Sequence, residues 1–215
     1  MTELHWQTVT PLMREVLRTV GKSDLCPRFY LAGGTALALQ LGHRRSIDLD
    51  FFSATDEVRP EMHRQALRVL ESFGPTIVEQ AWGNLLLLVQ NLHVGFFGYG
   101  CALLATPSLA EGVPMASVTD IGLMKLDALA TRASRKDFYD LYAIAQRVPL
   151  QDLLDLAPTK YPLVRDFEAL VVRYMAYFDL AEQEQPPLLL EAVDWRSVKE
   201  FFREQAVELG RRWLE

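Results

Sequence analysis

The sequence predicts an α/β (α+β) protein in which a mixed sheet flanked by helices is followed by a C-terminal helical region. Three observations lead to this prediction. Residues 29–53 form two strand-like apolar runs joined by a Gly-Gly-Thr turn and one short helix. Residues 76–97 contain three short runs that are typical of strands. Beyond residue 116 the apolar positions recur at helical spacing.

The segment before the sheet is predicted to form a helix that begins at Thr10-Pro11. The Thr10 hydroxyl can cap the helix, and Pro11 suits its first turn. Apolar residues then recur three and four positions apart, and Gly21 suits the end of the helix. The stretch 29–53 follows, with a strand, the glycine turn, a helix of small residues, a basic loop and a second strand.

A further helix is predicted to begin at Pro60 and to end at Gly74-Pro75. Turn residues then separate three predicted strands, at 76–80, 84–90 and 93–97. This antiparallel run is expected to extend the sheet that the two earlier strands begin.

Residues 107–114 begin and end with proline and predict a linker. The expected domains are therefore a core domain over residues 1–115 and a helical region over residues 116–215. Ser117 and Asp120 have the spacing of a capping box at the start of the first helix of that region. Later helices are predicted over residues 164–178 and from Asp194 onward.

Composition favours a globular protein, since half of the 215 residues are hydrophobic and 23% are charged. The formal net charge of −6 counts against a dedicated nucleic-acid binder without excluding RNA as a substrate. No signal peptide or membrane span is predicted. Cys26 and Cys101 lack metal-ligand spacing. We therefore expect a cytoplasmic protein with reduced thiols and no membrane partner.

The candidate chemistry centres on Asp48 and Asp50, which stand at i and i+2 of a predicted strand and project from the same face. Adjacent carboxylates repel each other, so a strand that holds them together favours a cation site. Gly33 and Gly34 allow the backbone to approach a ligand, and the next helix directs free N–H groups and its positive dipole end there. A phosphate-binding turn facing a metal site is the apparatus of phosphoryl or nucleotidyl transfer.

Lys125 has apolar residues four positions before and after it, so it lies along the apolar stripe of a predicted helix. A buried ammonium requires a partner, although a lysine at the edge of a stripe can also extend to solvent. Asp137 and Asp140 lie one turn apart on the next helix and can bind Lys125 and Arg132 or receive a substrate proton. A purely structural ion-pair network is the alternative.

Two blocks of the sequence are similar to a known family. Gly-Gly-Thr (33–35) and, after a helix, Asp48-x-Asp50 resemble the first motif of the polymerase-β-type nucleotidyltransferases. A longer and more specific motif resembles the AbiEii/AbiGii family of bacterial nucleotidyltransferase toxins. It reads Leu-Ala-Gly-Gly-Thr-Ala-Leu…His-Arg-x-Ser-x-Asp-Leu-Asp-Phe-Phe. Residues 120–142 resemble the second signature of that family. The resemblance implies a polymerase-β-like nucleotidyltransferase sheet, with a helical region that completes the active site.

The resemblance also implies the activity, which is transfer of a nucleoside monophosphate from a nucleoside triphosphate. The expected cofactor is Mg²⁺ (or Mn²⁺), the expected acceptor is tRNA or another RNA, and a cognate antitoxin is a possible partner. The implied catalytic residues are Asp48, Asp50, Lys125, Asp137 and Asp140, of which Asp48 and Asp50 bind the metal. The candidates for nucleotide binding are Gly33, Gly34, Thr35, Arg45, Ser46, Lys125 and Arg132. For the two arginines the alternative is a solvated surface charge.

The sequence departs from the superfamily at the third carboxylate, which many members carry on a later strand. The corresponding run, residues 93–99, contains no acid, so the general base is unassigned. His93 is either that base or a structural histidine. Two other functions stay open. One is nucleotidyl transfer to an antibiotic or metabolite, and the other is binding of a nucleotide or a partner protein without catalysis.

Overall fold

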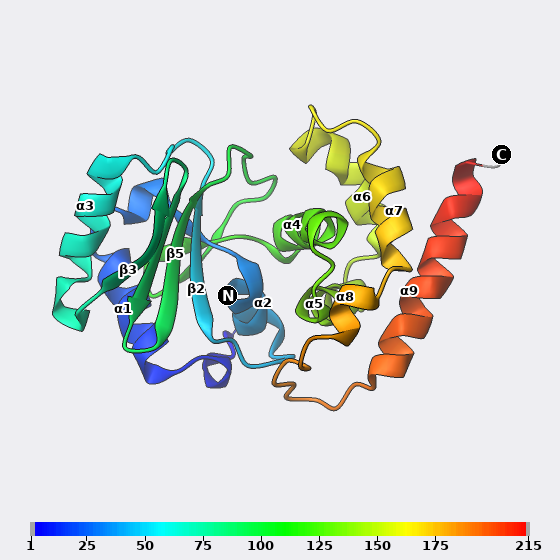
Figure 1. Ribbon diagram of the computed structural model, residues 1–215, viewed down its shortest axis with the longest axis horizontal. Helices are drawn as coiled ribbons and strands as arrows, with labels where there is room; N and C mark the ends of the chain where they lie inside the picture. The colour runs from blue at the N-terminus through cyan, green and yellow to red at the C-terminus, as the bar shows by residue number, and fades with distance from the viewer. Residues whose placement is uncertain (1–2, 214–215) are drawn as a thin grey trace. The chain divides into compact units, whose positions relative to one another are not determined.

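The computed structural model describes residues 3–213 of the chain, except for the side chain of residue 213. The chain divides into two compact units, Met1–Ser117 and Val118–Glu215. The first unit contains a mixed sheet with helices, and the second is helical (Figure 1). The predicted α/β fold class, with a mixed sheet followed by a helical region, is confirmed.

The first unit is built on a seven-stranded sheet in the order β3-β4-β5-β2-β1-β7-β6. Its strands are β1 (Tyr30–Leu31), β2 (Asp48–Ser53), β3 (Thr76–Ala81), β4 (Asn84–Val89), β5 (Leu92–Gly98), β6 (Ser108–Ala110) and β7 (Val113–Met115). The β2–β5 and β1–β7 pairs are parallel, and the other pairs are antiparallel. Each of the three strands predicted over residues 76–97 is present, with its ends shifted by no more than one residue.

The two faces of the sheet differ in character, because side chains alternate along each strand. On β2, Leu49 and Phe51 are fully buried, whereas Asp48 and Asp50 are partly exposed. Phe51 stacks on Phe96 of β5, with 5.0 Å between the ring centroids. Helices α1 (Pro11–Gly21) and α3 (Pro60–Val69) lie on the same side of β3 and β5 (Figure 1). The two carboxylates therefore project from the face opposite the Phe51 core.

Helix ends in the first unit follow local chemistry. Thr10 caps α1 as predicted, since its side chain accepts a hydrogen bond from the backbone N–H of Met13 at 3.2 Å. Helix α2 (Gly33–Leu41) ends at Gly42, which has a φ of +70°. Helix α3 is shorter than predicted, and a separate 3₁₀ turn, η3 (Glu71–Phe73), precedes Gly74. Two more 3₁₀ turns are η1 (Trp6–Thr8) and η2 (Cys26–Arg28).

The predicted linker over residues 107–114 is wrong, because this segment forms the hairpin of β6 and β7 at the end of the sheet. Glu111 and Gly112 make the turn, with φ values of +49° and +89°. Two positive φ values in succession are the geometry of a type I′ hairpin turn. Pro107 and Pro114 suggested a break in regular structure, and the turn at Glu111-Gly112 between them was not predicted.

The second unit consists of helices packed around an aromatic core. Its elements are α4 (Val118–Thr131), α5 (Arg135–Ala145), α6 (Leu150–Lys160), α7 (Phe167–Met175), α8 (Asp179–Glu182), α9 (Trp195–Gly210) and η4 (Arg211–Trp213). Phe138 of α5 lies 5.0 Å from Phe178, 5.7 Å from Trp195 and 5.1 Å from Phe202, measured between ring centroids. This cluster joins the α8 region and α9 to α5.

The helix predicted over residues 164–178 is shorter in the structure, because α7 covers only Phe167–Met175. Asp166 has a φ of +54°, a left-handed conformation that prevents the helix from starting earlier. Pro158 lies inside α6, although a proline usually interrupts a helix.

A buried ion pair connects α4 to α6. Lys160 Nζ lies 2.8 Å from Asp120 Oδ1, and both side chains are fully buried. The carboxylate that pairs with Lys160 belongs to Asp120, the residue predicted to form a capping box with Ser117. The signal for Lys160 was present in the sequence, because it follows Leu153 and Ala157 at i+7 and i+3 on the buried stripe of α6.

Asp120→Asn is expected to destabilise the second unit by about 2 kcal/mol, because it leaves the buried Lys160 ammonium with a weaker, neutral acceptor. Urea unfolding monitored by circular dichroism measures the change. Asp152→Asn on the exposed side of α6 is the matched control and should change stability by no more than about 0.5 kcal/mol. Equal effects of the two substitutions would contradict a stabilising role for the Lys160–Asp120 pair.

Candidate functional site

The glycine turn places the start of α2 beside the strand that carries the acids. Gly33 has a φ of +63°, and a Cβ there would also lie 2.9 Å from Asp50 Oδ2. Both facts require glycine at this position. Ala32, the N-cap residue of α2, provides no side-chain cap. The first N–H groups of a helix have no partner within that helix, so this end is suited to an anion.

Asp48 and Asp50 occupy the same face of β2, as their spacing predicted. Both are partly exposed, whereas Leu49 between them is fully buried. The backbone N–H of Ala32 donates to the Asp50 carbonyl at 3.1 Å, which fixes the glycine turn against β2. The structure thus brings Gly33 and Asp50 together, with the carboxylate beside the first residue of α2.

Thr35 and Ser46 connect α2 to the start of β2 through their hydroxyl groups. Thr35 Oγ1 hydrogen-bonds to the carbonyl oxygen of Asp48 and lies 2.8 Å from Ser46 Oγ. Both residues are buried. Thr35 and Ser46 are predicted to bind the nucleotide, and in this structure the Thr35 hydroxyl is directed to the Asp48 carbonyl. In this arrangement Thr35 and Ser46 hold the Asp48 backbone in place.

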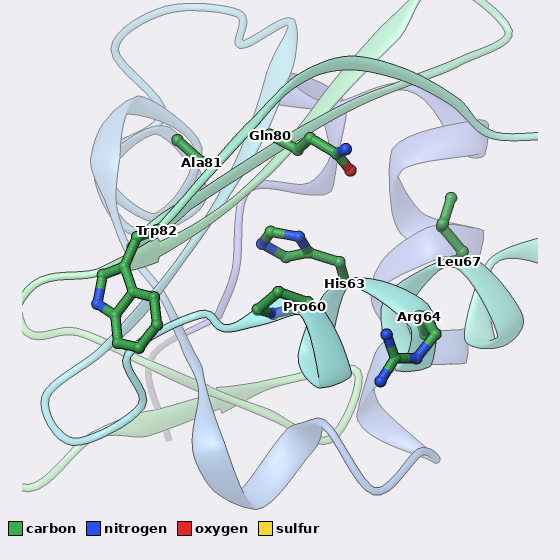
Figure 2. A pocket seen from close by; sticks show the side chains of 7 residues that line it. All are labelled: Pro60, His63, Arg64, Leu67, Gln80, Ala81 and Trp82. Carbon is green, nitrogen blue, oxygen red and sulfur yellow. The ribbon is translucent and has the colours of Figure 1, made fainter.

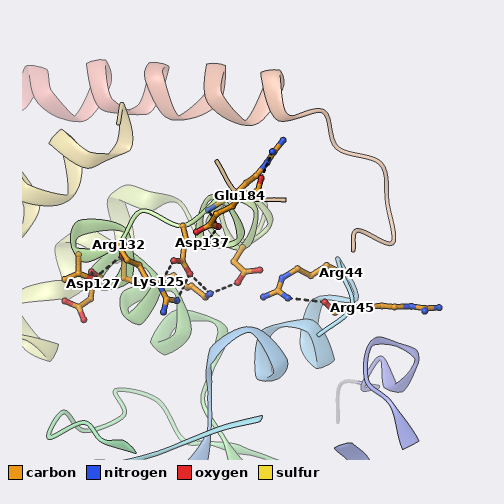
Figure 3. A network of polar contacts seen from close by, with 12 residues as sticks. Arg44, Arg45, Lys125, Asp127, Arg132, Asp137 and Glu184 are labelled. Carbon is orange, nitrogen blue, oxygen red and sulfur yellow. Dashed lines mark hydrogen bonds and ion pairs between the residues drawn. The ribbon is translucent and has the colours of Figure 1, made fainter. Parts of the chain in front are cut away.

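The basic loop contains one buried and one exposed arginine. Arg44 is only 5% exposed, and a Cβ on Gly34 would overlap its Nη2. Its Nη1 donates to the Arg45 carbonyl at 3.1 Å (Figure 3). Arg45, the residue singled out from the sequence, is exposed. The guanidinium that contacts the glycine turn therefore belongs to Arg44, a residue that the sequence motif contained but that we did not select.

The strand beside β2 carries no third carboxylate. In the parallel register, Asp48 lies beside His93 and Asp50 lies beside Gly95. His93 Nδ1 is 3.5 Å from Asp48 Oδ1, and half of the histidine side chain is exposed. A Cβ on Gly95 would lie 3.4 Å from Asp50 Oδ1. The position next to Asp50 is thus held by a residue without a side chain.

The carboxylate pair fits part of a magnesium site. Carboxylate oxygens are the ligands that Mg²⁺ prefers, and the ion commonly uses one or two of them together with substrate phosphates and waters. Among residues 3–213 there is no group of three or more His, Cys, Asp and Glu side chains with metal-binding geometry. Asp48 and Asp50 would supply the protein ligands of such an ion.

The candidate residues of the second unit form one ion-pair network between α4 and α5. Lys125 Nζ lies 2.7 Å from Asp137 Oδ1 and 2.6 Å from Asp140 Oδ2. Arg132 donates to the other side of Asp137, with Nε 2.8 Å from Oδ2 (Figure 3). Lys125 is 5% exposed, and both carboxylates are fully buried. The structure brings together the four residues that the sequence grouped.

The neighbours of Asp137 favour its ionised form despite its burial. Burial alone would raise the pKa of this carboxyl, but the charge of Lys125 and the hydrogen bond from Arg132 lower the pKa below its usual value near 3.8. The network therefore stabilises the fold at neutral pH, and that contribution is lost as the pH falls through the lowered pKa. Asp127, which is half-buried, behaves differently, since burial raises its pKa.

Comparison with known families places these residues in context. The model of the family described as "Nucleotidyl transferase AbiEii toxin, Type IV TA system" matches residues 15–81 and 101–210 of the chain. A protein of Aquifex aeolicus (strain VF5) that carries no assigned function is 34% identical over 202 residues, which cover 91% of this chain and 94% of the relative.

Solved structures support the fold. MenT4, a nucleotidyltransferase toxin from Mycobacterium tuberculosis H37Rv, superposes with a TM-score of 0.61 at 20% identity, covering 93% of this chain and 82% of MenT4. ANT(2")-Ia in complex with adenylyl-2"-tobramycin gives a TM-score of 0.54 at 14% identity, covering 70% of this chain and 95% of that protein. At these identities the likeness shows the fold alone.

Proposed function

This chain belongs to the AbiEii family of nucleotidyltransferase toxins, and on that premise we propose that it transfers a nucleoside monophosphate from a nucleoside triphosphate to RNA, with tRNA as the expected acceptor. The proposed reaction depends on Mg²⁺ or Mn²⁺. The observation that supports it most strongly is the position of Asp50 over Gly33, beside the uncapped start of α2. Carboxylates for a cation and N–H groups for an anion meet there.

In the proposed reaction an acceptor oxygen bonds to the α-phosphorus, the bond from that phosphorus to the bridging oxygen breaks, and pyrophosphate leaves. The first N–H groups of α2 would bind phosphate oxygens. Asp48 and Asp50 would hold the metal ion. Lys125 would neutralise charge on the phosphates, and Asp137 and Asp140 would keep its ammonium in place. The acceptor proton would pass to His93, which lies beside Asp48, or to water, since the residue paired with Asp50 is Gly95.

Radiolabel transfer tests the proposal. Purified full-length protein is incubated with Mg²⁺, total RNA and each of the four α-labelled nucleoside triphosphates in turn. We expect label in RNA of tRNA size with one or more of the triphosphates, and none when EDTA is present. Label in small molecules alone would indicate an antibiotic or metabolite acceptor. Bound nucleotide that is never turned over would mean that the chain only binds nucleotides.

Arg44→Gln is expected to raise the KM for the nucleoside triphosphate at least about tenfold, since a charge-assisted hydrogen bond contributes about 1.5–3 kcal/mol. Gly34→Ala should have a similar effect, because the new Cβ would displace the Arg44 guanidinium. The double variant should be little worse than either single one. Steady-state kinetics on variants with unchanged circular dichroism measure this. If Arg45→Gln raised the KM more than Arg44→Gln does, the phosphate-binding arginine would be Arg45, as selected from the sequence, and the assignment to Arg44 would be contradicted.

A cognate antitoxin protein is the second proposed partner, because the family is described as part of a type IV toxin–antitoxin system. Expression of the chain alone in a bacterial host is expected to lower the number of colonies at least about tenfold. Asp48→Asn should abolish that effect. Equal toxicity of the wild-type chain and the Asp48→Asn variant would mean that the toxicity does not depend on catalysis.

A further inference from the structure

Strand β3 forms one end of the sheet. It is the first strand in the sheet order, and within residues 3–213 it hydrogen-bonds to β4 alone. All six of its residues are exposed. An edge strand presents backbone N–H and C=O groups that can pair with another chain. The edge contains neither Lys nor Pro, which commonly protect such strands, although a register shift occurs between Ile77 and Glu79.

Large apolar side chains lie exposed along and just beyond this strand. Trp82, in the turn after β3, is 68% exposed, and Val78 is 52% exposed. Trp82 also contacts the guanidinium of Arg59, which lies 4.8 Å from the ring centroid. Tryptophan and arginine are the residues most enriched at the centres of protein interfaces. The composition of this edge is therefore that of a protein-binding surface.

A pocket of about 370 Å³ lies between α3 and the end of β3. Its lining includes His63, Arg64 and Leu67 from α3, and Gln80 and Trp82 from the strand and its turn (Figure 2). The pocket thus combines apolar walls with a small number of polar groups, as ligand sites usually do.

The strand register assigns the pocket to one face of the sheet. Gln80 lies beside Leu85, and Leu85 lies beside Phe96, which stacks on Phe51 in the core. Paired residues share a face. Gln80 is therefore on the face opposite Asp50, so an occupant of the pocket would leave the carboxylate pair accessible.

The polar groups of the pocket favour an acidic occupant. His63 is 7% exposed, and its Nε2 has no hydrogen-bond partner within the described residues. Buried polar atoms without partners are uncommon, and a bound ligand is one way to satisfy them. Arg64 is two-thirds exposed, and in the part of the chain that the structure describes its ion-pair contact is with the exposed Glu61 at 3.3 Å. Arg68, one turn further along α3, is also exposed. These groups make α3 locally basic in a chain of net charge −6.

We propose that an extended segment of a partner protein pairs with β3 as an additional strand and inserts an acidic side chain into the pocket beside Arg64 and His63. Main-chain hydrogen bonds along β3 would provide affinity, and the pocket would select the acidic residue, as in other cases of strand addition. The site is separate from the carboxylates of β2, so it does not depend on the proposed catalytic function.

A peptide selection tests the proposal. The probe is a phage-displayed library of random twelve-residue peptides, selected on the full-length protein. We expect the enriched sequences to share an Asp or Glu within a run of β-branched or aromatic residues. The matching synthetic peptide should slow hydrogen exchange of the β3 amides and should lose at least tenfold in affinity when its acid is replaced by the corresponding amide.

Three variants locate the binding site. Arg64→Glu and Val78→Lys, both at exposed positions, should each weaken binding of that peptide at least tenfold. Arg147→Glu, an exposed arginine in the second unit, is the matched control and should leave binding unchanged. Selection without an acidic consensus, equal binding by the Arg64→Glu variant, or competition between the peptide and a nucleoside triphosphate would each overturn the proposal.

Discussion

Asp48→Asn is expected to lower the rate of nucleotidyl transfer at least about 10³-fold while the fold stays intact. Removing a carboxylate that holds a catalytic metal ion costs several kcal/mol of transition-state stabilisation, and each 1.4 kcal/mol is about a factor of ten in rate. The fold should not suffer, because the Asp48 side chain is a third exposed and its ion-pair contact with His93 is long, at 3.5 Å. We expect a change of less than about 1 kcal/mol in the free energy of unfolding.

Single-turnover measurements with saturating nucleotide test this result, and Asp50→Asn should behave in the same way. Asp24→Asn makes the same chemical change at an exposed position of the first unit and should leave the rate unchanged. A transfer rate within tenfold of wild type in the Asp48→Asn variant would exclude the carboxylate pair as the catalytic metal site.

Lys125→Met should have the next largest effect, about 10²–10³-fold on the transfer rate, as for loss of a group that stabilises transition-state charge. It should also cost about 3–5 kcal/mol of stability, because Asp137 and Asp140 are fully buried and lose their ammonium partner. Rates must therefore be measured at a temperature where circular dichroism shows the variant to be folded.

A second pair of variants separates catalysis from stability. Asp140→Asn in the Lys125→Met background removes a buried charge that has lost its ammonium partner, and the remaining carboxylate, Asp137, keeps its hydrogen bonds from Arg132. The double variant should regain most of the lost stability while its rate stays low. Asp140→Asn alone shows how much of the loss in rate belongs to Asp140. If the rate recovers together with the stability, the α4–α5 network is only structural.

Much of the fold was predictable because strong local signals agreed with the tertiary structure. Alternation along β2 and the turns at Gly83 and Gln90-Asn91 define strands that match the structure. The failures came from backbone conformations that residue types report poorly. Asp166 adopts a left-handed φ without being glycine, and a proline that usually interrupts a helix lies within α6.

The candidate site was predictable as a set of residue types and less so as a set of contacts. Helical spacing placed Lys125 on the apolar stripe but left open whether it pairs or extends to solvent, and the structure supplies two carboxylates. Spacing does not distinguish adjacent arginines in a loop, so the choice of Arg45 over Arg44 had no physical basis. The hydrogen bond from the Thr35 hydroxyl to the Asp48 carbonyl depends on how α2 packs on β2, which the sequence does not report.

The fate of two different labels on the nucleoside triphosphate tests the central claim most directly. Wild-type protein is incubated with Mg²⁺ and RNA, once with α-labelled and once with γ-labelled nucleotide. If the chain transfers a nucleoside monophosphate, the α-label enters RNA and the γ-label appears only in pyrophosphate. Entry of the γ-label into RNA, or entry of neither label into any acceptor, would contradict the account.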